Sequence, residues 1–312
     1  MPVLVAPVLV ALVLATLTAA GPARADEAII APLAAESLLL DVAPAGARLV
    51  AVGERGHILI SDDGGGTWTQ VPAPTRATLT AVHFHDDRHG WAVGHDAVIL
   101  RTRDAGAHWE LVHSAPDEER PLLDVWFRDP EHGFAVGAYG FFLRTADGGL
   151  SWRPDPIGPD DFHLNGIGDA GGGRLYLAAE AGLLYRSDDG GQSWIELPSP
   201  YEGSFFGTLA PGAGTVLAFG LRGHLFRSED AGESWVPVET GTDALLMDAL
   251  RAGNGSIVVA GLAGTVLVSA DGGRTFESRV LDDRAGLVAL ATAADGGVIA
   301  VGEGGPRRLA AP

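Results

Sequence analysis

The eight residues Ser187-Asp188-Asp189-Gly190-Gly191-Gln192-Ser193-Trp194 decide the fold, because the chain repeats their pattern. The pattern Ser/Thr-x-Asp-x-Gly-x-x-Trp recurs at residues 61–68, 102–109, 145–152 and 228–235. A sixth copy at residues 269–276 ends in Phe in place of Trp. The rest of the chain is spaced around these six copies, which we call boxes.

Each box has the composition of a tight backbone turn. The Gly at its fifth position favours a positive φ, and the Asp at its third position can accept hydrogen bonds from N–H groups of the turn. The closing Trp offers a large apolar face for packing against a neighbouring sheet. Because the Asp recurs in one register, we interpret the boxes as structural and not catalytic. The residues concerned are Asp63, Asp104, Asp147, Asp189, Asp230 and Asp271, with Trp68, Trp109, Trp152, Trp194 and Trp235.

The repeat unit has the length of one propeller blade. The box Asp recurs every 41 to 43 residues, and a short apolar run precedes each box. These runs lie at residues 50–53, 91–94, 134–137, 176–179, 217–220, 258–261 and 299–302. In the second unit we expect four strands, at residues 79–84, 91–94, 98–102 and 108–112. The pattern predicts an all-β fold, a seven-bladed β-propeller with four-stranded antiparallel blades.

The seventh unit is incomplete, because a box in register would begin near Ala310 and the sequence given stops at Pro312. The strand-like stretch at residues 27–32 precedes the first unit and has no other assigned role. We therefore expect residues 27–32 to form the outermost strand of the last blade, next to residues 307–310. This arrangement would cover an edge strand that is otherwise unpaired.

The first 25 residues have the features of a signal peptide. An apolar run extends from Val3 to Leu17, and Ala23-Arg24-Ala25 fits the small-x-small rule for cleavage, although a basic n-region is missing. We expect cleavage after Ala25, a mature propeller domain at residues 26–312, and a periplasmic or otherwise exported protein. The alternative is an N-terminal membrane anchor, for which the apolar run is short.

The composition narrows the possible partners and cofactors. The chain has 312 residues, a formal net charge of −19 and no Cys, and all 21 basic residues are Arg. The absence of Cys excludes disulfides and thiol chemistry, and the negative charge argues against nucleic acids and anionic membrane surfaces as partners. We expect a monomer with no cofactor and no small-molecule substrate.

The sequence also gives little support for a metal site or for catalysis. His83, His85, Asp86, Asp87 and His89 look like metal ligands, but the next unit repeats the same turn with Trp126, Arg128, Asp129, Pro130 and His132. A repeated turn explains these residues better than a zinc site, which needs three or four converging ligands. The sequence also lacks a His-Glu-x-x-His motif, a phosphate-binding Gly-Lys-Ser/Thr loop and a Gly-x-Ser-x-Gly motif.

A glycan-active protein is the main alternative, since sialidases share the box. A sialidase needs three converging Arg residues and a Tyr nucleophile with a Glu base, and Tyr139, Tyr176, Tyr185 and Tyr201 do not stand in such a setting. Another glycoside hydrolase with paired carboxylates, or a glycan-binding module, remains open. We expect no enzymatic activity.

Several stretches together carry a resemblance to one family. They are Leu38-Leu39-Leu40-Asp41, the run at residues 50–59, the box at residues 61–68 and Gly90-Trp91-Ala92-Val93-Gly94-His95. The chain resembles the photosystem II assembly and stability factor family of BNR-repeat, or Asp-box, propellers. Family members in oxygenic phototrophs are non-enzymatic factors that hold a membrane-protein precursor, and similar proteins occur in bacteria without a photosystem. The resemblance implies an exported protein-binding scaffold with a membrane or envelope protein as partner, and photosynthesis only as a family label.

The resemblance also singles out the residue before each box. The family carries Arg there, and this chain matches at Arg101, Arg144, Arg186 and Arg227 but has Ile60 and Val268 in the other two units. The Arg residues are candidates for a basic strip that binds an acidic partner segment. The alternative is that each Arg packs between blades and donates hydrogen bonds to box carbonyls or to Asp. Because the position obeys the repeat, we favour the alternative.

The loops between units differ, and binding usually sits in variable loops on a rigid scaffold. These loops include residues 117–120, 160–163, 201–206 and 282–284. Tyr201, Glu202 and Phe205 are the best candidates for a partner-binding patch, because aromatic side chains are enriched in interfaces. The alternative is that Phe205 or Phe206 belongs to the core.

Overall fold

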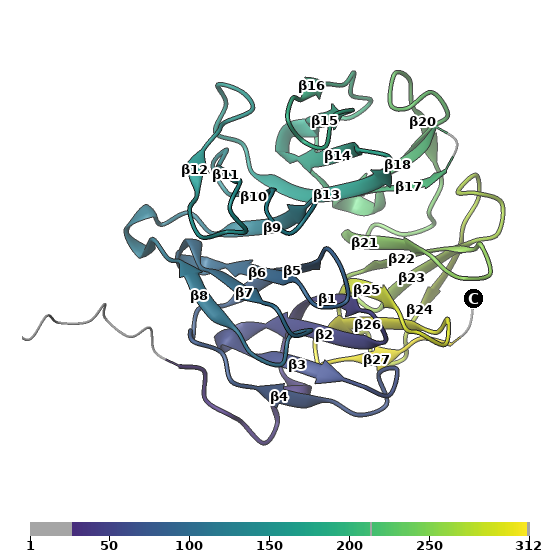
Figure 1. The fold of residues 1–312 in the computed structure, drawn as a ribbon. Coiled ribbons are helices and arrows are strands. Elements are labelled where there is room, and N and C mark those ends of the chain that lie inside the picture. Colours follow the sequence, from purple (N-terminus) through teal and green to yellow (C-terminus); the bar gives the residue numbers. More distant parts are fainter. Residues whose placement is uncertain (1–26, 213, 311–312) are drawn as a thin grey trace, which may run out of the picture.

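The computed structural model describes residues 27–212 and 214–310. Seven antiparallel sheets are arranged in a ring, and each is built from strands that are consecutive in sequence (Figure 1). The predicted signal peptide and its cleavage site at Ala25 lie outside the described residues. No helix among the described residues is long and apolar enough to cross a membrane.

The first three blades contain twelve strands. Blade one comprises β1 (Leu39–Ala45), β2 (Arg48–Gly53), β3 (Ile58–Ser61) and β4 (Thr69–Val71). Blade two comprises β5 (Leu79–Phe84), β6 (Gly90–Gly94), β7 (Ile99–Thr102) and β8 (Glu110–His113). Blade three comprises β9 (Leu122–Phe127), β10 (Gly133–Gly137), β11 (Phe142–Thr145) and β12 (Arg153–Pro154).

The remaining four blades follow in the same order. Blade four comprises β13 (Leu164–Gly171), β14 (Arg174–Ala179), β15 (Leu184–Ser187) and β16 (Ile195–Glu196). Blade five comprises β17 (Phe205–Gly212), β18 (Thr215–Gly220), β19 (Leu225–Ser228) and β20 (Val236–Val238). Blade six comprises β21 (Leu246–Arg251), β22 (Ile257–Gly261), β23 (Thr265–Ser269) and β24 (Glu277–Val280). Blade seven comprises β25 (Leu287–Thr292), β26 (Val298–Gly302) and β27 (Arg307–Arg308).

Short 3-10 turns are the only helical elements of the described residues. They are η1 (Ala34–Glu36), η2 (Glu54–Gly56), η3 (His95–Ala97), η4 (Pro116–Glu118), η5 (Glu180–Gly182) and η6 (Leu221–Gly223). The predicted seven-bladed, all-β propeller with four-stranded blades is therefore confirmed, with three strands described in the last blade.

The second strand of each blade explains the apolar runs seen in the sequence. It lies between the first and third strands of its own sheet and is covered on both faces by neighbouring blades, so its side chains are buried on both sides. In blade one, Val50 and Val52 face a core shared with blade two, whereas Leu49 and Ala51 face a core shared with blade seven. A separate apolar core of this kind lies between every pair of adjacent blades.

The prediction that residues 27–32 form the outermost strand of the last blade is wrong. Residues 27–32 are not part of any sheet, and their backbone bonds to blade one: Ala28 N–H donates to the Ala73 carbonyl at 2.9 Å. The Gln70 side chain donates to the Ile29 carbonyl and accepts from Ala31 N–H, at 3.0 and 2.8 Å. Ile29 and Ile30 face solvent, so they do not supply the burial expected of a closing strand.

The ring closes instead through side-by-side contacts of blades seven and one. Ile299 and Val301 of β26 share an apolar core with Leu49 and Leu59 of blade one. A Cβ built on Gly305 would lie 1.8 Å from the Ala35 carbonyl, so η1 fits tightly against the last hairpin. The outermost described strand of blade seven is β27, which is two residues long, arginine-rich and preceded by Pro306. These are features that keep an edge strand from pairing with other chains.

Candidate functional site

The six boxes form turns with one shared hydrogen-bond pattern. In the box at residues 187–194, the Ser187 hydroxyl accepts from Gly191 N–H at 2.8 Å, and Asp189 Oδ1 accepts from Ser193 N–H at 2.9 Å. The Ser193 hydroxyl donates to Asp189 Oδ2 at 2.6 Å. Slight burial raises the pKa of Asp189. The hydrogen bonds from Ser193 and Ser187 outweigh this effect and lower the pKa to about 2. The Asp is therefore ionised and fully occupied as an acceptor.

The seventh box position is a feature that the sequence reasoning missed. In every box its backbone N–H and its side chain both bond the Asp, and the residues are Thr67, His108, Ser151, Ser193, Ser234 and Thr275. A Ser, Thr or His in that register was the available signal. The box Trp packs behind the turn: Trp194 meets Phe134 of blade three edge-to-face, with ring centroids 5.7 Å apart.

The arginines before the boxes contact the next blade. Arg101 donates to the Gly148 carbonyl at 2.9 Å, and Arg227 donates to the Gly272 carbonyl at 3.0 Å. Arg144 reaches the Gly191 carbonyl at 2.7 Å. Each acceptor belongs to the box of the following blade, which is the geometry of the alternative favoured from the sequence. Arg101 and Arg227 are buried, so neither guanidinium offers a partner an open surface.

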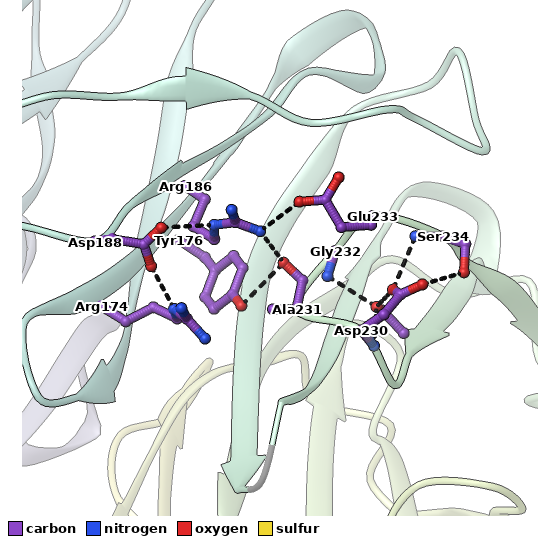
Figure 2. Close-up of polar contacts among 10 residues, drawn as sticks. Arg174, Tyr176, Arg186, Asp188, Asp230, Ala231, Gly232, Glu233 and Ser234 are labelled. Carbon is purple, nitrogen blue, oxygen red and sulfur yellow. Dashed lines mark hydrogen bonds and ion pairs between the residues drawn. The ribbon is translucent and has the colours of Figure 1, made fainter.

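Figure 2 shows this contact between blades four and five. Arg186 donates to the Ala231 carbonyl at 2.9 Å and pairs with Asp188 on its own blade and Glu233 on the next. The Tyr176 hydroxyl donates to the same Ala231 carbonyl at 3.2 Å. The strip of arginines is thus held by carbonyls and carboxylates of the propeller itself.

The two departures from the arginine pattern have a structural explanation. Ile60 stands in place of Arg in blade one, and there Arg48 of β2 donates to the Ala105 carbonyl of the next box at 3.1 Å. Val268 stands in place of Arg in blade six, and the described residues of the following blade, blade seven, contain no box whose carbonyl it could meet. Arg308 of blade seven completes the series by donating to Gly64 of the first box.

A basic pocket lies between blades three and four. Its volume is about 380 Å³, and its walls include Trp126, Arg128, His132, Arg144, Arg153, Asp155, Gly190 and Gln192. Arg144 is engaged by Asp155 at 2.6 Å, whereas Arg153 is 68% exposed and lies 3.7 Å from the same carboxylate. Arg128 lies over the next box, and a Cβ built on Gly190 would be 3.2 Å from its Cδ. The pocket presents more positive than negative charge in an acidic protein.

Only Arg144 of this pocket was among the predicted residues. Arg153 follows the box directly, where the other five boxes are followed by Thr69, Glu110, Ile195, Val236 and Glu277. This break in the repeat was a usable signal, since a basic residue occurs at that position in one unit alone.

The predicted aromatic patch is only partly at the surface. Phe205 is completely buried as the first residue of β17, so its place in the patch is wrong and the core alternative holds for it. Tyr201 is half-buried and stacks on His224, with ring centroids 4.4 Å apart, while Glu202 is exposed. The strand begins earlier than the loop boundary drawn from the sequence, which explains the error.

Three carboxylates line the central channel. The channel has a volume of about 380 Å³ and is walled by first strands, among whose residues Asp41, Asp124 and Asp248 occupy one register. Each accepts from the N–H of its own next residue and from a first strand of the next blade, with Asp41 bonding Val42 and Val82 at 2.7 Å. Asp124 and Asp248 accept in the same way from Ile167 and Leu290.

The channel environment shifts the pKa of these carboxyls upward. Burial raises the pKa of Asp41 to about 8, opposed by the Val82 and Val42 hydrogen bonds and reinforced by the charges of Asp124 and Asp248. Burial likewise raises the pKa of Asp124 to about 7 and of Asp248 to about 6. Each side chain keeps some accessible surface because it borders the channel. The bonding of both oxygens to backbone identifies these groups as links between blades.

The histidine-rich turn of blade two does not gather ligands at one point. His83 lies beside the Phe127 carbonyl at 3.3 Å, and burial lowers its pKa to about 4. His89 instead pairs with Asp86 at 2.8 Å in the turn. The corresponding turn of blade three brings Asp129, Glu131 and His132 within 4.8 Å, but Asp129 already accepts from two backbone N–H groups there. Both turns have the same internal bonding.

Comparisons with known proteins support the propeller fold. The sequence matches the profile of a family described as "Photosynthesis system II assembly factor YCF48" over residues 65–120 and 113–258. It is 33% identical over 131 residues to the "Photosystem II assembly lipoprotein Ycf48" of Synechococcus sp. (strain CC9902). This match covers 42% of this chain and 27% of that protein. Matches to such curated relatives span from 11% to 39% of the relatives' own length.

Two solved structures show the same fold. "YCF48 bound to D1 peptide" superposes with a TM-score of 0.72 and 19% identity, over 92% of this chain and 97% of that one. Virginiamycin B lyase from Staphylococcus aureus superposes with a TM-score of 0.74 and 12% identity, over 90% of this chain and 96% of that one. At these identities the likeness concerns the fold.

Proposed function

Because the chain belongs to the photosynthesis system II assembly factor YCF48 family, we propose that it is a non-enzymatic, exported scaffold that binds a membrane or envelope protein. A seven-bladed ring with internally satisfied turns is a rigid support of the kind on which binding surfaces are carried. That a related structure holds a D1 peptide supports an extended segment of the partner as the ligand. Several relatives are named lipoproteins, which supports a location at a membrane.

The basic pocket between blades three and four is the observation that carries this function. Its accessible groups are the guanidiniums of Arg128 and Arg153 and the half-exposed ring of His132. Arg144 lines the pocket as well, but Asp155 and the Gly191 carbonyl already hold it. Guanidinium groups bind carboxylates through paired hydrogen bonds, and aromatic side chains provide the apolar contact typical of interfaces. We propose that an acidic segment of the partner binds here. The other three arginines before boxes, Arg101, Arg186 and Arg227, all donate to carbonyls of the ring.

Catalysis has no comparable support. The three channel carboxylates bond backbone N–H groups with both oxygens, and the box carboxylates bond their own turns. A hydrolytic pair needs carboxyl groups that face a substrate across a fixed gap. We therefore propose binding without turnover, by a monomer that needs no cofactor.

Charge reversal in the pocket tests the proposal. The tagged full chain is used to capture its partner from solubilised envelope membranes, with Arg128→Glu and Arg153→Glu in one variant. Arg103→Glu is the matched control, since Arg103 is 61% exposed and lies outside the pocket. We expect the pocket variant to lose capture and the control to keep it. Equal capture by both would remove the pocket from the proposal, and turnover of a sialoside or oligosaccharide would remove the non-enzymatic scaffold.

A further inference from the structure

The segment before blade one presents three large apolar side chains to solvent. Ile29 is 63% exposed, Ile30 57% and Leu33 63%, and they lie within five positions of one another. We call these residues the N-terminal apolar edge. Other exposed large apolar side chains, such as Ile195, Val236 and Val280, lie singly on the outer strands of separate blades. Exposed apolar side chains that gather in one place mark an interaction site, and these three lie on one short segment.

The apolar edge is held in place by the propeller. Ala28 N–H bonds the Ala73 carbonyl, Gln70 bonds the backbone of Ile29 and Ala31, and Arg76 Nε donates to the Glu27 carbonyl at 2.9 Å. The inward places are taken by the small side chains of Ala28 and Ala34, both buried. The isoleucines therefore remain outside while the backbone is tied to blade one.

We propose that Ile29, Ile30 and Leu33 contact a lipid surface and set the rim of blade one against a membrane. This inference rests on the proposed function at a membrane and adds an orientation to it. In Figure 1 blades four and five lie across the ring from blade one, so they would point away from the lipid.

The chain before the edge favours lipid as the occupant. Twenty-six residues precede Glu27, and they include the apolar run from Val3 to Leu17. Leu17 and Ile29 are twelve positions apart, a span of at most about 40 Å when extended. In the membrane-anchored alternative to cleavage after Ala25, the edge is therefore within reach of the bilayer that holds this run. A second copy of the chain fits less well, because a net charge of −19 opposes self-association.

The charge also specifies the lipid. An acidic protein is repelled by an anionic surface, and the edge is flanked by exposed Glu27 and Glu36. Contact through apolar side chains alone should therefore be strongest on zwitterionic lipid, with the side chains reaching roughly 5–10 Å into the headgroup region. Anionic lipid should weaken the contact at low salt, and added salt should restore it.

The absence of Cys makes a site-specific test direct. A polarity-sensitive thiol dye is attached to the full chain carrying Ile30→Cys or, as a matched control, Val236→Cys, since Ile30 and Val236 are each 57% exposed. With phosphatidylcholine vesicles we expect a blue shift, and quenching by brominated lipid, at position 30 and not at position 236. Phosphatidylglycerol vesicles at low salt should give a smaller shift. No shift at position 30, or equal shifts at both positions, overturns the proposal.

A second set of variants separates lipid from other occupants. Ile29→Ser, Ile30→Ser and Leu33→Ser together should reduce retention on vesicles, whereas the same change at Ile195, Val236 and Val280 should not. Thermal melting checks that both variants fold. A shift at position 30 that appears without lipid as protein concentration rises would assign the edge to a second copy and overturn the proposal. Partner capture by the Arg128/Arg153 variant is measured separately, so failure of the proposed function is distinguishable from failure of the lipid contact.

Discussion

The Arg308 guanidinium donates a hydrogen bond of 3.2 Å to the backbone carbonyl of Gly64, which joins the last described strand to the first box. Arg101, Arg144, Arg186 and Arg227 make the same contact between successive blades inside the ring. Blade seven is thus attached to blade one in the way that inner blades are attached to each other. Within residues 27–310, the propeller closes by repeating this lateral contact, and no described strand is shared between its two ends.

Removing Arg308 should therefore destabilise the ring, but less than removing Arg227. Arg308 is 46% exposed, so Arg308→Ala should lower the free energy of unfolding by about 1 kcal/mol or less. Arg227 is buried and bonds Gly272, so Arg227→Ala should cost roughly 2–3 kcal/mol. Urea denaturation measures both, with the exposed Arg284→Ala as control. Equal losses for Arg308 and Arg227 would contradict the role given to burial.

Acid should weaken the boxes. Hydrogen bonds from Thr67 and Ser61 lower the pKa of Asp63 to about 2, and similar bonds act on Asp189 and Asp230. A folded-state pKa below the unfolded value contributes stability that is present above about pH 4 and is lost as pH falls towards 2. The melting temperature should drop across that window. Asp189→Ala should cost about 1–2 kcal/mol at pH 7 and reduce the drop, because its hydrogen bonds are already absent. An unchanged acid profile in the variant would refute this.

The repeat could be recognised in the sequence because the residues that define it act within a few positions of one another. Gly191 and Asp189 define a turn by their own chemistry, and strand two, as in Trp91–Val93, is apolar because both of its faces are buried. The number of blades follows from the spacing at which these residues recur along the chain. The Arg contacts could also be anticipated, since a position that obeys the repeat serves the ring.

Features that depend on contacts between residues far apart in the sequence could not be predicted from local patterns. Ile29 and Ile30 look like part of a strand in the sequence, but in the structure neither belongs to a sheet and both side chains face solvent. Which blade takes the segment depends on Gln70 and Ala73, far along the chain. The channel carboxylates had a signal, since Asp41, Asp124 and Asp248 each follow two apolar residues, but their bonding crosses between blades.

Deleting residues 27–32 should have a small effect on stability. The deletion removes the hydrogen bonds to Ala73 and Gln70. It loses little apolar burial, because Ile29 and Ile30 already face solvent. The loss of a few partly exposed hydrogen bonds is offset by the backbone entropy released, so we expect a change of about 1 kcal/mol or less. Thermal melting of the deleted chain beside the full chain measures it. A fall of many degrees would contradict this and mean that the segment stabilises the propeller by more than these exposed bonds.

The channel carboxylates should make the protein less stable as pH rises from about 4 to 8. Asp41 has a folded-state pKa of about 8, whereas an unfolded Asp titrates near 3.9. Between these values the folded chain holds a proton that the unfolded chain has lost, so the free energy of unfolding falls with rising pH and levels off above 8. This trend is opposite in sign to that of the boxes, and the two together place maximal stability near pH 4 to 5.

Asp41→Ala isolates the contribution of one such carboxyl. Alanine fits the site, because Ala81 and Ala289 occupy the same register in blades two and seven. One proton accounts for at most about 1.4 kcal/mol per pH unit, and contact with channel water reduces that ceiling. The variant should lose stability at pH 4.5, where the Val82 N–H loses its acceptor, and should show a shallower decline towards pH 8 than the full chain. Urea midpoints at intervals across this range give the slope, with exposed Asp282→Ala as control. Parallel profiles for the variant and the unmodified chain would mean that Asp41 is ionised in the fold, and that the two backbone hydrogen bonds to it outweigh its burial.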